Sequence, residues 1–138
     1  MKRSAIIIKK SKDGTRCIAV DEENFDILNS FFQKDKRYIK KFKFICELLL
    51  QNHKNRELYD KEEPDSLSIG VRAMKFFKGQ ENARVYCREV TRENKTFVIV
   101  AVELLERKKQ TKLTHKELNI IHRVADYEYT EFKYYEDL

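Results

Sequence analysis

The sequence predicts an α+β fold in a single domain covering residues 1–138. Two observations support this prediction. Apolar side chains recur at helical spacing in segments 25–32, 38–50 and 114–125. Short apolar or alternating runs bounded by turn residues occupy 5–8, 16–20, 68–77, 84–90 and 97–105. The predicted order is therefore a hairpin, two helices, three strands and a last helix.

The first half of the chain begins with a predicted hairpin. Asp13-Gly14 lies between the runs 5–8 and 16–20, and this dipeptide is a strong signal for a tight turn. Acidic residues and Asn24 then provide candidates for a helix start before Phe25. A second helix follows, with Tyr38, Phe42, Ile45 and Leu49 on one face. The polar segment 51–65 is expected to be a loop.

The second half predicts an antiparallel meander, because only short turns separate the runs 68–77, 84–90 and 97–105. Thr114 with Glu117 three residues later is typical of a helix capping box. The tail 127–135 is aromatic and acidic, and no element is predicted there.

Composition limits the possible functions. The net charge is +6, and the positive charge is concentrated between residues 68 and 123. No apolar run is long enough to span a membrane, and the apolar run within the first nine residues is too short for a signal peptide. We therefore expect a cytoplasmic protein with no membrane partner. The three cysteines are far apart among apolar neighbours, which favours core positions over a metal site.

A cluster of cations is the strongest functional signal. Arg107, Lys108, Lys109 and Lys112 lie between the last predicted strand and the helix that follows. Ends of strands and the loops after them are common positions for functional side chains. Phosphate is the anion that best fits this cluster.

Alternation along segment 84–90 places Arg84, Tyr86 and Arg88 on one face of a strand. Cations beside an aromatic ring suit RNA, although alternation alone favours a solvated face with a salt bridge to a residue such as Glu103. His115 and His122 are seven residues apart, about 10.5 Å along a helix, so no shared metal is expected. Only three glycines occur and no phosphate-binding loop is present, so no cofactor is expected.

Three stretches together resemble the RelE/ParE toxin superfamily, in particular its HigB-like, phage-derived branch. They are Gly70-Val-Arg-Ala-Met-Lys75, Arg84-Val-Tyr86-Cys, and the gap-free stretch 103–118, which contains the three lysines of the cluster and the Glu-Leu start of the last helix. Glu106 replaces a phenylalanine of the family, and Lys75 an arginine. The resemblance implies two N-terminal helices packed on a small antiparallel sheet, with a C-terminal helix.

The resemblance also implies function: the toxin of a bacterial toxin–antitoxin system, a metal-free endoribonuclease acting on mRNA at the ribosome, with a cognate antitoxin as its protein partner. In that reaction a 2′-hydroxyl attacks the adjacent phosphate, so the site needs a base, cations and an acid. The implied catalytic residues are Arg84, Lys75, Lys108 and Tyr127, with Tyr129 as an alternative to Tyr127. The resemblance implies that Lys109 and Lys112 bind RNA, and the residue pattern adds Arg88, Arg107 and His115 as candidate RNA-binding residues.

A second hypothesis belongs to another functional class. The chain is then a catalytically silent module of the same fold that binds a partner protein or nucleic acid. Glu106 and the absence of arginine at position 75 favour this hypothesis, whereas the unbroken register of Lys108, Lys109 and Lys112 favours the toxin.

Overall fold

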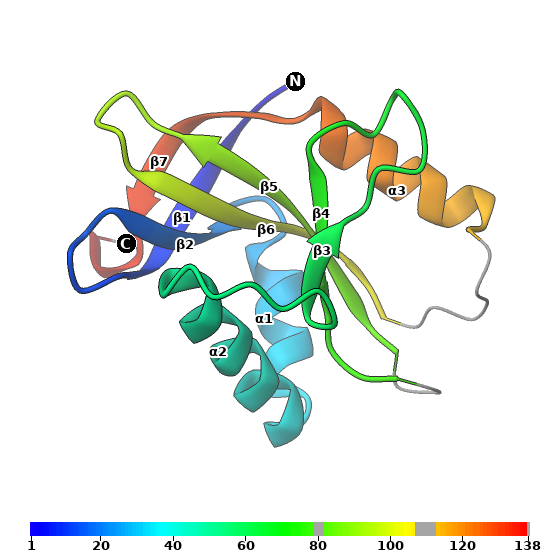
Figure 1. Ribbon diagram of the computed structural model, residues 1–138, viewed down its shortest axis with the longest axis horizontal. Helices are drawn as coiled ribbons and strands as arrows, with labels where there is room; N and C mark the ends of the chain where they lie inside the picture. The colour runs from blue at the N-terminus through cyan, green and yellow to red at the C-terminus, as the bar shows by residue number, and fades with distance from the viewer. Residues whose placement is uncertain (79–81, 107–112, 138) are drawn as a thin grey trace.

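The computed structural model describes residues 1–78, 82–106 and 113–137 (Figure 1). The elements follow one another in this order: β1 (Lys2–Lys10), β2 (Arg16–Asp21), α1 (Phe25–Gln33), α2 (Lys36–Leu50), β3 (Tyr59–Lys61), β4 (Val71–Lys75), β5 (Arg84–Thr91), β6 (Phe97–Leu105), α3 (His115–Asp126), β7 (Glu128–Tyr134) and a short 3₁₀ turn (Tyr135–Asp137).

Within the described residues, the seven strands form one mixed sheet in the order β3-β4-β5-β6-β2-β1-β7. The hairpin β1–β2 and the meander β4–β5–β6 are antiparallel, as the sequence predicts. Two parallel pairings complete the sheet. Strand β2 pairs with β6, which joins the hairpin to the meander, and β7 pairs with β1. The two ends of the chain therefore lie in adjacent strands.

The prediction of two N-terminal helices on a small antiparallel sheet is wrong. The chain starts with a strand, the sheet is mixed and has seven strands in the described region, and the first two helices come only after β2. The error lies in long-range pairing. The parallel pairs β2–β6 and β1–β7 join segments far apart in sequence, and local periodicity carries no information about such pairs. Strands β3 and β7 were also missed, the first in a predicted loop and the second in the unassigned tail.

Local signals explain most of the element boundaries. Gly14 adopts φ +74°, and Asp13 accepts hydrogen bonds from the Ser11 hydroxyl and the Thr15 amide, which closes the β1–β2 turn. Thr114 caps α3 by accepting a hydrogen bond from the Glu117 amide at 3.2 Å. The predicted hairpin turn and the predicted start of the last helix are both confirmed.

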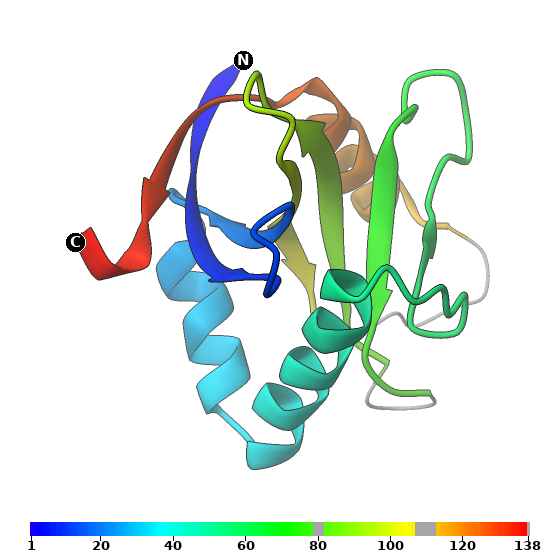
Figure 2. The same ribbon diagram turned by 60° about the vertical axis from the view of Figure 1, so that its left-hand side comes forward.

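The sheet buries both of its faces. Alternate residues of β2 show this, because Ile18 packs with α1 and α2 whereas Cys17 packs on the side of α3. Figure 2 shows α1 and α2 together on one side of the sheet and α3 on the other. None of the helices in the described region is long and apolar enough to cross a membrane.

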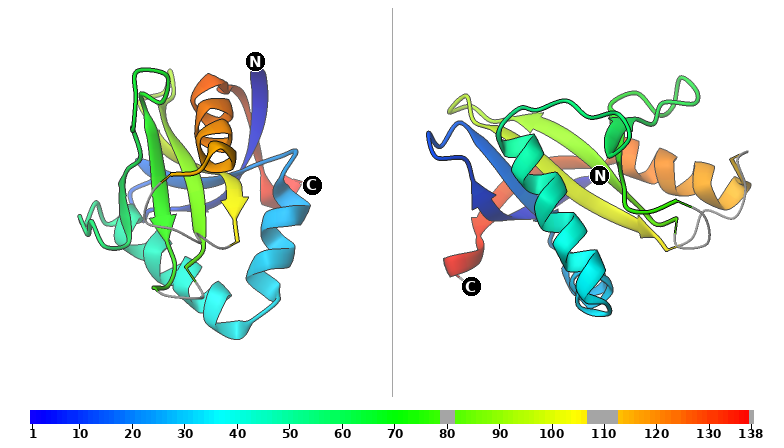
Figure 3. Two further views of the ribbon diagram at one scale, coloured as in Figure 1. Left: turned by 90° about the vertical axis from the view of Figure 1, so that its right-hand side faces the viewer. Right: turned by 60° about the horizontal axis from the view of Figure 1, so that its bottom comes forward.

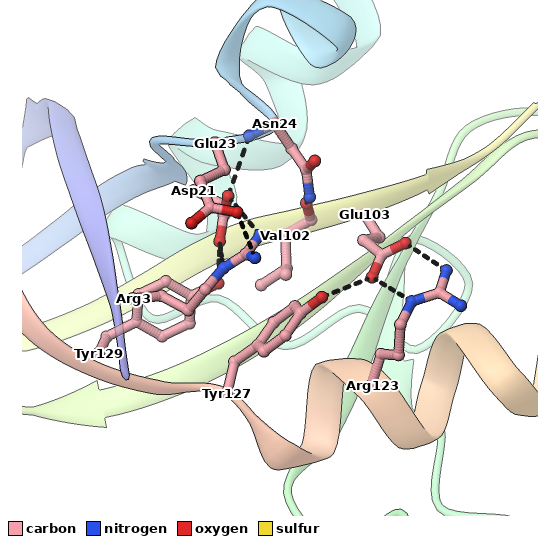
Figure 4. A network of polar contacts seen from close by, with 9 residues as sticks. All are labelled: Arg3, Asp21, Glu23, Asn24, Val102, Glu103, Arg123, Tyr127 and Tyr129. Carbon is pink, nitrogen blue, oxygen red and sulfur yellow. Dashed lines mark hydrogen bonds and ion pairs between the residues drawn. The ribbon is translucent and has the colours of Figure 1, made fainter. Parts of the chain in front are cut away.

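A buried ion pair joins the N-terminal hairpin to the end of the chain (Figure 4). Arg3 donates from Nε and Nη2 to the two oxygens of Asp21, both at 2.9 Å, and Tyr129 donates to Asp21 at 2.6 Å. The backbone amide of Asn24, at the start of α1, donates to the same carboxylate at 3.0 Å. Asp21 is completely buried. Burial and the hydrogen bond to Asp21 raise the pKa of Tyr129, so its hydroxyl stays protonated as a donor.

We predict that Asp21→Ala lowers the free energy of unfolding by about 3–5 kcal/mol, because the Arg3 guanidinium stays buried after losing its buried carboxylate partner. Glu23→Ala is the matched control. Glu23 also contacts Arg3, but its side chain is 69% exposed, so we expect a loss of about 1 kcal/mol or less. Urea unfolding of both variants measures the difference, and equal losses would contradict the structural role given to Asp21.

Candidate functional site

Three strand ends meet at one end of the sheet. Strand β4 ends at Lys75, β5 begins at Arg84 and β6 ends at Leu105, and the register places Arg84 directly opposite both other residues. Lys75 and Arg84, two of the predicted catalytic cations, are therefore neighbours on adjacent strands. They come from different strands, and only the antiparallel pairing of β4 with β5 brings them together.

A hollow of about 600 Å³ opens beside these strand ends, and we call it the sheet-end hollow. Five cations and one carboxylate, that of Glu57, are among its lining residues; the cations are Lys41, Arg56, Lys75, Lys78 and Arg84. The partly buried ring of Phe77 also lines it, with Lys41 Nζ 5.5 Å from the ring centre. Lys75 Nζ donates to the Arg56 carbonyl at 3.4 Å. The hollow thus combines an aromatic ring with an excess of positive charge.

Arg84 is largely buried and only loosely paired. Its Nη1 lies 3.7 Å from Glu62, and its side chain is 14% exposed. Its Nε is buried, with no hydrogen-bond partner in the described part of the chain, and the same holds for the hydroxyl of Tyr86 on the same strand. Burial raises the pKa of Tyr86, and the charges of Glu62 and Glu117 raise it further, while Arg84 lowers it. Tyr86 is therefore a neutral phenol with an unused donor close to Arg84.

The predicted cation cluster cannot be placed. Arg107, Lys108, Lys109 and Lys112 lie outside the described residues. The described residues before and after the cluster both lie close to the start of β5. Leu105 is paired with Arg84, and the charge of Glu117 acts on Tyr86. Glu106, the acidic departure from the toxin pattern, lies 3.8 Å from the ammonium group of Lys34.

Arg88 lies on the same face of β5 as Tyr86, as alternation predicts, but α3 packs over that face. Its Nη1 donates at 2.9 Å to the carbonyl of Ala125 in the last turn of α3. A guanidinium at this position satisfies a helix-end carbonyl and complements the negative end of the helix dipole. The backbone of Gly70 approaches closely, since a Cβ there would lie 3.2 Å from Arg88 Nη1.

Tyr127 and His115 lie apart from the sheet-end hollow. The Tyr127 hydroxyl donates to Glu103 at 3.3 Å, and the Arg3 guanidinium lies 4.0 Å above its ring centre (Figure 4). His115 is exposed at the first residue of α3. Glu103, considered as a salt-bridge partner for Arg84, instead pairs with Arg123 at 2.8 Å.

Sequence reasoning missed three cations of the hollow. Lys41 lay in the predicted second helix but not among the residues of its apolar face, Arg56 lay in a predicted loop, and Lys78 lay in a predicted turn. No local pattern marks them, because they come together through the packing of α2 and the pairing of β3 with β4.

The described residues contain no group of three or more His, Cys, Asp or Glu side chains arranged to hold a metal ion. Comparison of the chain with protein-family models, with curated proteins and with solved structures gives no match. The functional argument therefore rests on the geometry and charge of the site.

We predict that Tyr86→Phe leaves the free energy of unfolding unchanged or raises it by about 1 kcal/mol, because a buried donor without a partner carries a desolvation cost. Tyr129→Phe is the control, since its hydroxyl donates to buried Asp21, and we expect a loss of about 1.5–3 kcal/mol. Urea unfolding measures both. A comparable loss for Tyr86→Phe would mean that its hydroxyl has a partner in the folded protein.

Proposed function

We propose that the protein binds RNA at the sheet-end hollow. The observation that supports this is the composition of the hollow, in which five cations and one carboxylate surround a space of about 600 Å³ beside Phe77. Backbone phosphates pair with lysine and arginine, and unpaired bases stack on aromatic rings. The proposal includes a cytoplasmic setting, where mRNA is available.

This proposal corresponds to the second sequence hypothesis, that of a binding module, and it requires no cleavage. Nucleic acid is favoured over a protein partner because cations are the most numerous residues of the lining. Stable protein interfaces, by contrast, are depleted of charged residues, lysine among them, at their centres.

We predict that replacing Lys41 and Lys78 together by alanine weakens the binding of single-stranded RNA. Each lost phosphate contact lowers the slope of log affinity against log salt by about 0.7, so the double variant should lose roughly 1.4. Both residues are at least partly exposed, so the fold should persist. Fluorescence anisotropy with labelled uridine oligomers over a series of salt concentrations measures the slope.

The matched control is the double variant Lys2→Ala with Lys116→Ala. It removes the same charge from exposed positions on β1 and α3, away from the hollow. Equal losses of slope in the two double variants would mean that net charge, and not the hollow, attracts the RNA.

A second candidate function is cleavage of the bound RNA, the activity predicted for a toxin. It is favoured by Arg84, which lines the hollow and whose Nε has no hydrogen-bond partner in the described part of the chain. When a 2′-hydroxyl attacks phosphate, negative charge grows on the phosphate oxygens, and preorganised donors stabilise that charge. In this proposal mRNA at the ribosome is the substrate and an antitoxin is the protein partner.

We predict for this second candidate that induced expression slows bacterial growth, and that Arg84→Ala restores it. A donor to developing charge is worth about 2.7–4 kcal/mol, so RNA cleavage by the purified variant should fall roughly a hundredfold to a thousandfold. Arg123→Ala is the control. Arg123 is also ion-paired, with Glu103, but it lies on α3 and does not line the hollow. Unchanged growth and unchanged mRNA decay under strong induction would exclude the toxin and leave RNA binding standing.

A further inference from the structure

Two more hollows continue from the sheet-end hollow along the side of the molecule that carries α2. The central hollow, of about 380 Å³, shares Arg56 with the sheet-end hollow. The hairpin hollow, beside the β1–β2 turn, shares Arg16 and Asn52 with the central one. The three are therefore contiguous. The chain between α2 and β3 runs along this side, from the end of α2 to β3 (Figure 3, right). We call the three hollows together the basic track.

The basic track carries far more positive than negative charge. Its lining includes twelve cations and five carboxylates. Three of the carboxylates are already engaged, Asp13 with the β1–β2 turn, Glu47 with Lys9, and Glu89 with the Tyr59 hydroxyl. In contrast, several cations have no ion-pair partner in the part of the chain that the structure describes: Lys12, Lys54, Arg56, Lys61 and Lys78. Their charges remain available to an anionic ligand that extends along the track.

Aromatic rings occur in two of the three hollows. Phe77 lies in the sheet-end hollow, and Phe97 lines the central hollow with the Arg16 guanidinium 4.7 Å from its ring centre. Arg16 also donates to the Leu49 carbonyl near the end of α2, at 2.8 Å, so its plane is held in position. Rings and guanidinium planes of this kind are platforms for unpaired bases.

We propose that the basic track is the path of a single strand of RNA, which enters at the sheet-end hollow, passes Arg56 and reaches the β1–β2 turn. This inference rests on the proposed RNA-binding function and extends it from one hollow to three. Hollows of this size admit single groups such as bases. A duplex keeps its bases paired inside and cannot insert them, so a single strand fits hollows that combine cations with aromatic rings.

The test compares a uridine tetramer with a uridine dodecamer, by fluorescence anisotropy at several salt concentrations. The tetramer can occupy one hollow, whereas the dodecamer can extend along the track. We expect the native protein to bind the dodecamer more tightly and with a steeper salt slope, because more phosphates are neutralised. Equal affinity and equal slope for the two lengths would overturn the extended path.

Paired variants locate the contacts. Lys12→Ala with Lys54→Ala alters exposed residues of the hairpin and central hollows. We expect this variant to bind the tetramer normally and to lose roughly 1.4 in slope for the dodecamer. Lys41→Ala with Lys78→Ala should weaken the binding of both lengths. Lys2→Ala with Lys116→Ala controls for net charge and should reproduce the native values.

The outcomes separate the two proposals. If the Lys41 and Lys78 variant is weakened while the Lys12 and Lys54 variant binds the dodecamer normally, RNA binding stands and the path is wrong. If the Lys41 and Lys78 variant binds both lengths normally, the proposed function itself fails. If polyglutamate competes with the dodecamer as well as unlabelled RNA does, the track is a site for an acidic protein, and the inference is overturned.

Discussion

The ion pair between Arg3 and Asp21 is the interaction on which the rest of the architecture depends. Asp21 accepts hydrogen bonds from Arg3 on β1, from Tyr129 on β7 and from the backbone amide of Asn24 before α1. Asn24 then donates through its side chain to the Val102 carbonyl on β6. The buried carboxylate thus connects β2 with β1, with β7 and with the start of α1, and Asn24 connects the same corner with β6. A buried charge is tolerated only when it is paired and fully hydrogen-bonded, so this geometry is strongly specified.

The arrangement of strands in the mixed sheet explains where the cation-rich hollow forms. The Arg3 and Asp21 end is closed by β7 and by the ring of Tyr127, which lies under the Arg3 guanidinium. Toward the β3 edge of the sheet, β4 stops at Lys75 and β6 stops at Leu105, on either side of Arg84. A cation-rich hollow therefore forms beside these strand ends, on a scaffold held rigid by strand pairing. Such support keeps side chains in a defined geometry.

The same face of β5 carries residues with different roles. Tyr86 is fully buried beneath α3, Arg88 holds the carbonyl of Ala125, and Arg84 alone reaches the sheet-end hollow. A β-bulge between β5 and β6, next to Tyr86, contributes to this change by shifting the register between Glu103 and Ala101. Glu103 then faces Arg123 and Tyr127 (Figure 4). A strand that alternation alone describes as one basic face therefore carries one residue that packs in the core, one that caps α3 and one that lines the sheet-end hollow.

The sequence by itself determined the local elements. The turn at Gly14, the cap at Thr114, the three helices of the described region and the antiparallel meander all follow from signals within a few residues of each other. It also identified Lys75 and Arg84 as cations of a candidate site. Only the tertiary structure decided that β2 pairs with β6 and β7 with β1, which joins the seven strands of the described region into one sheet. It alone brought Lys41 and Arg56 to the hollow. The physical reason is that such pairings depend on burial and hydrogen bonding between distant segments, which no local periodicity records.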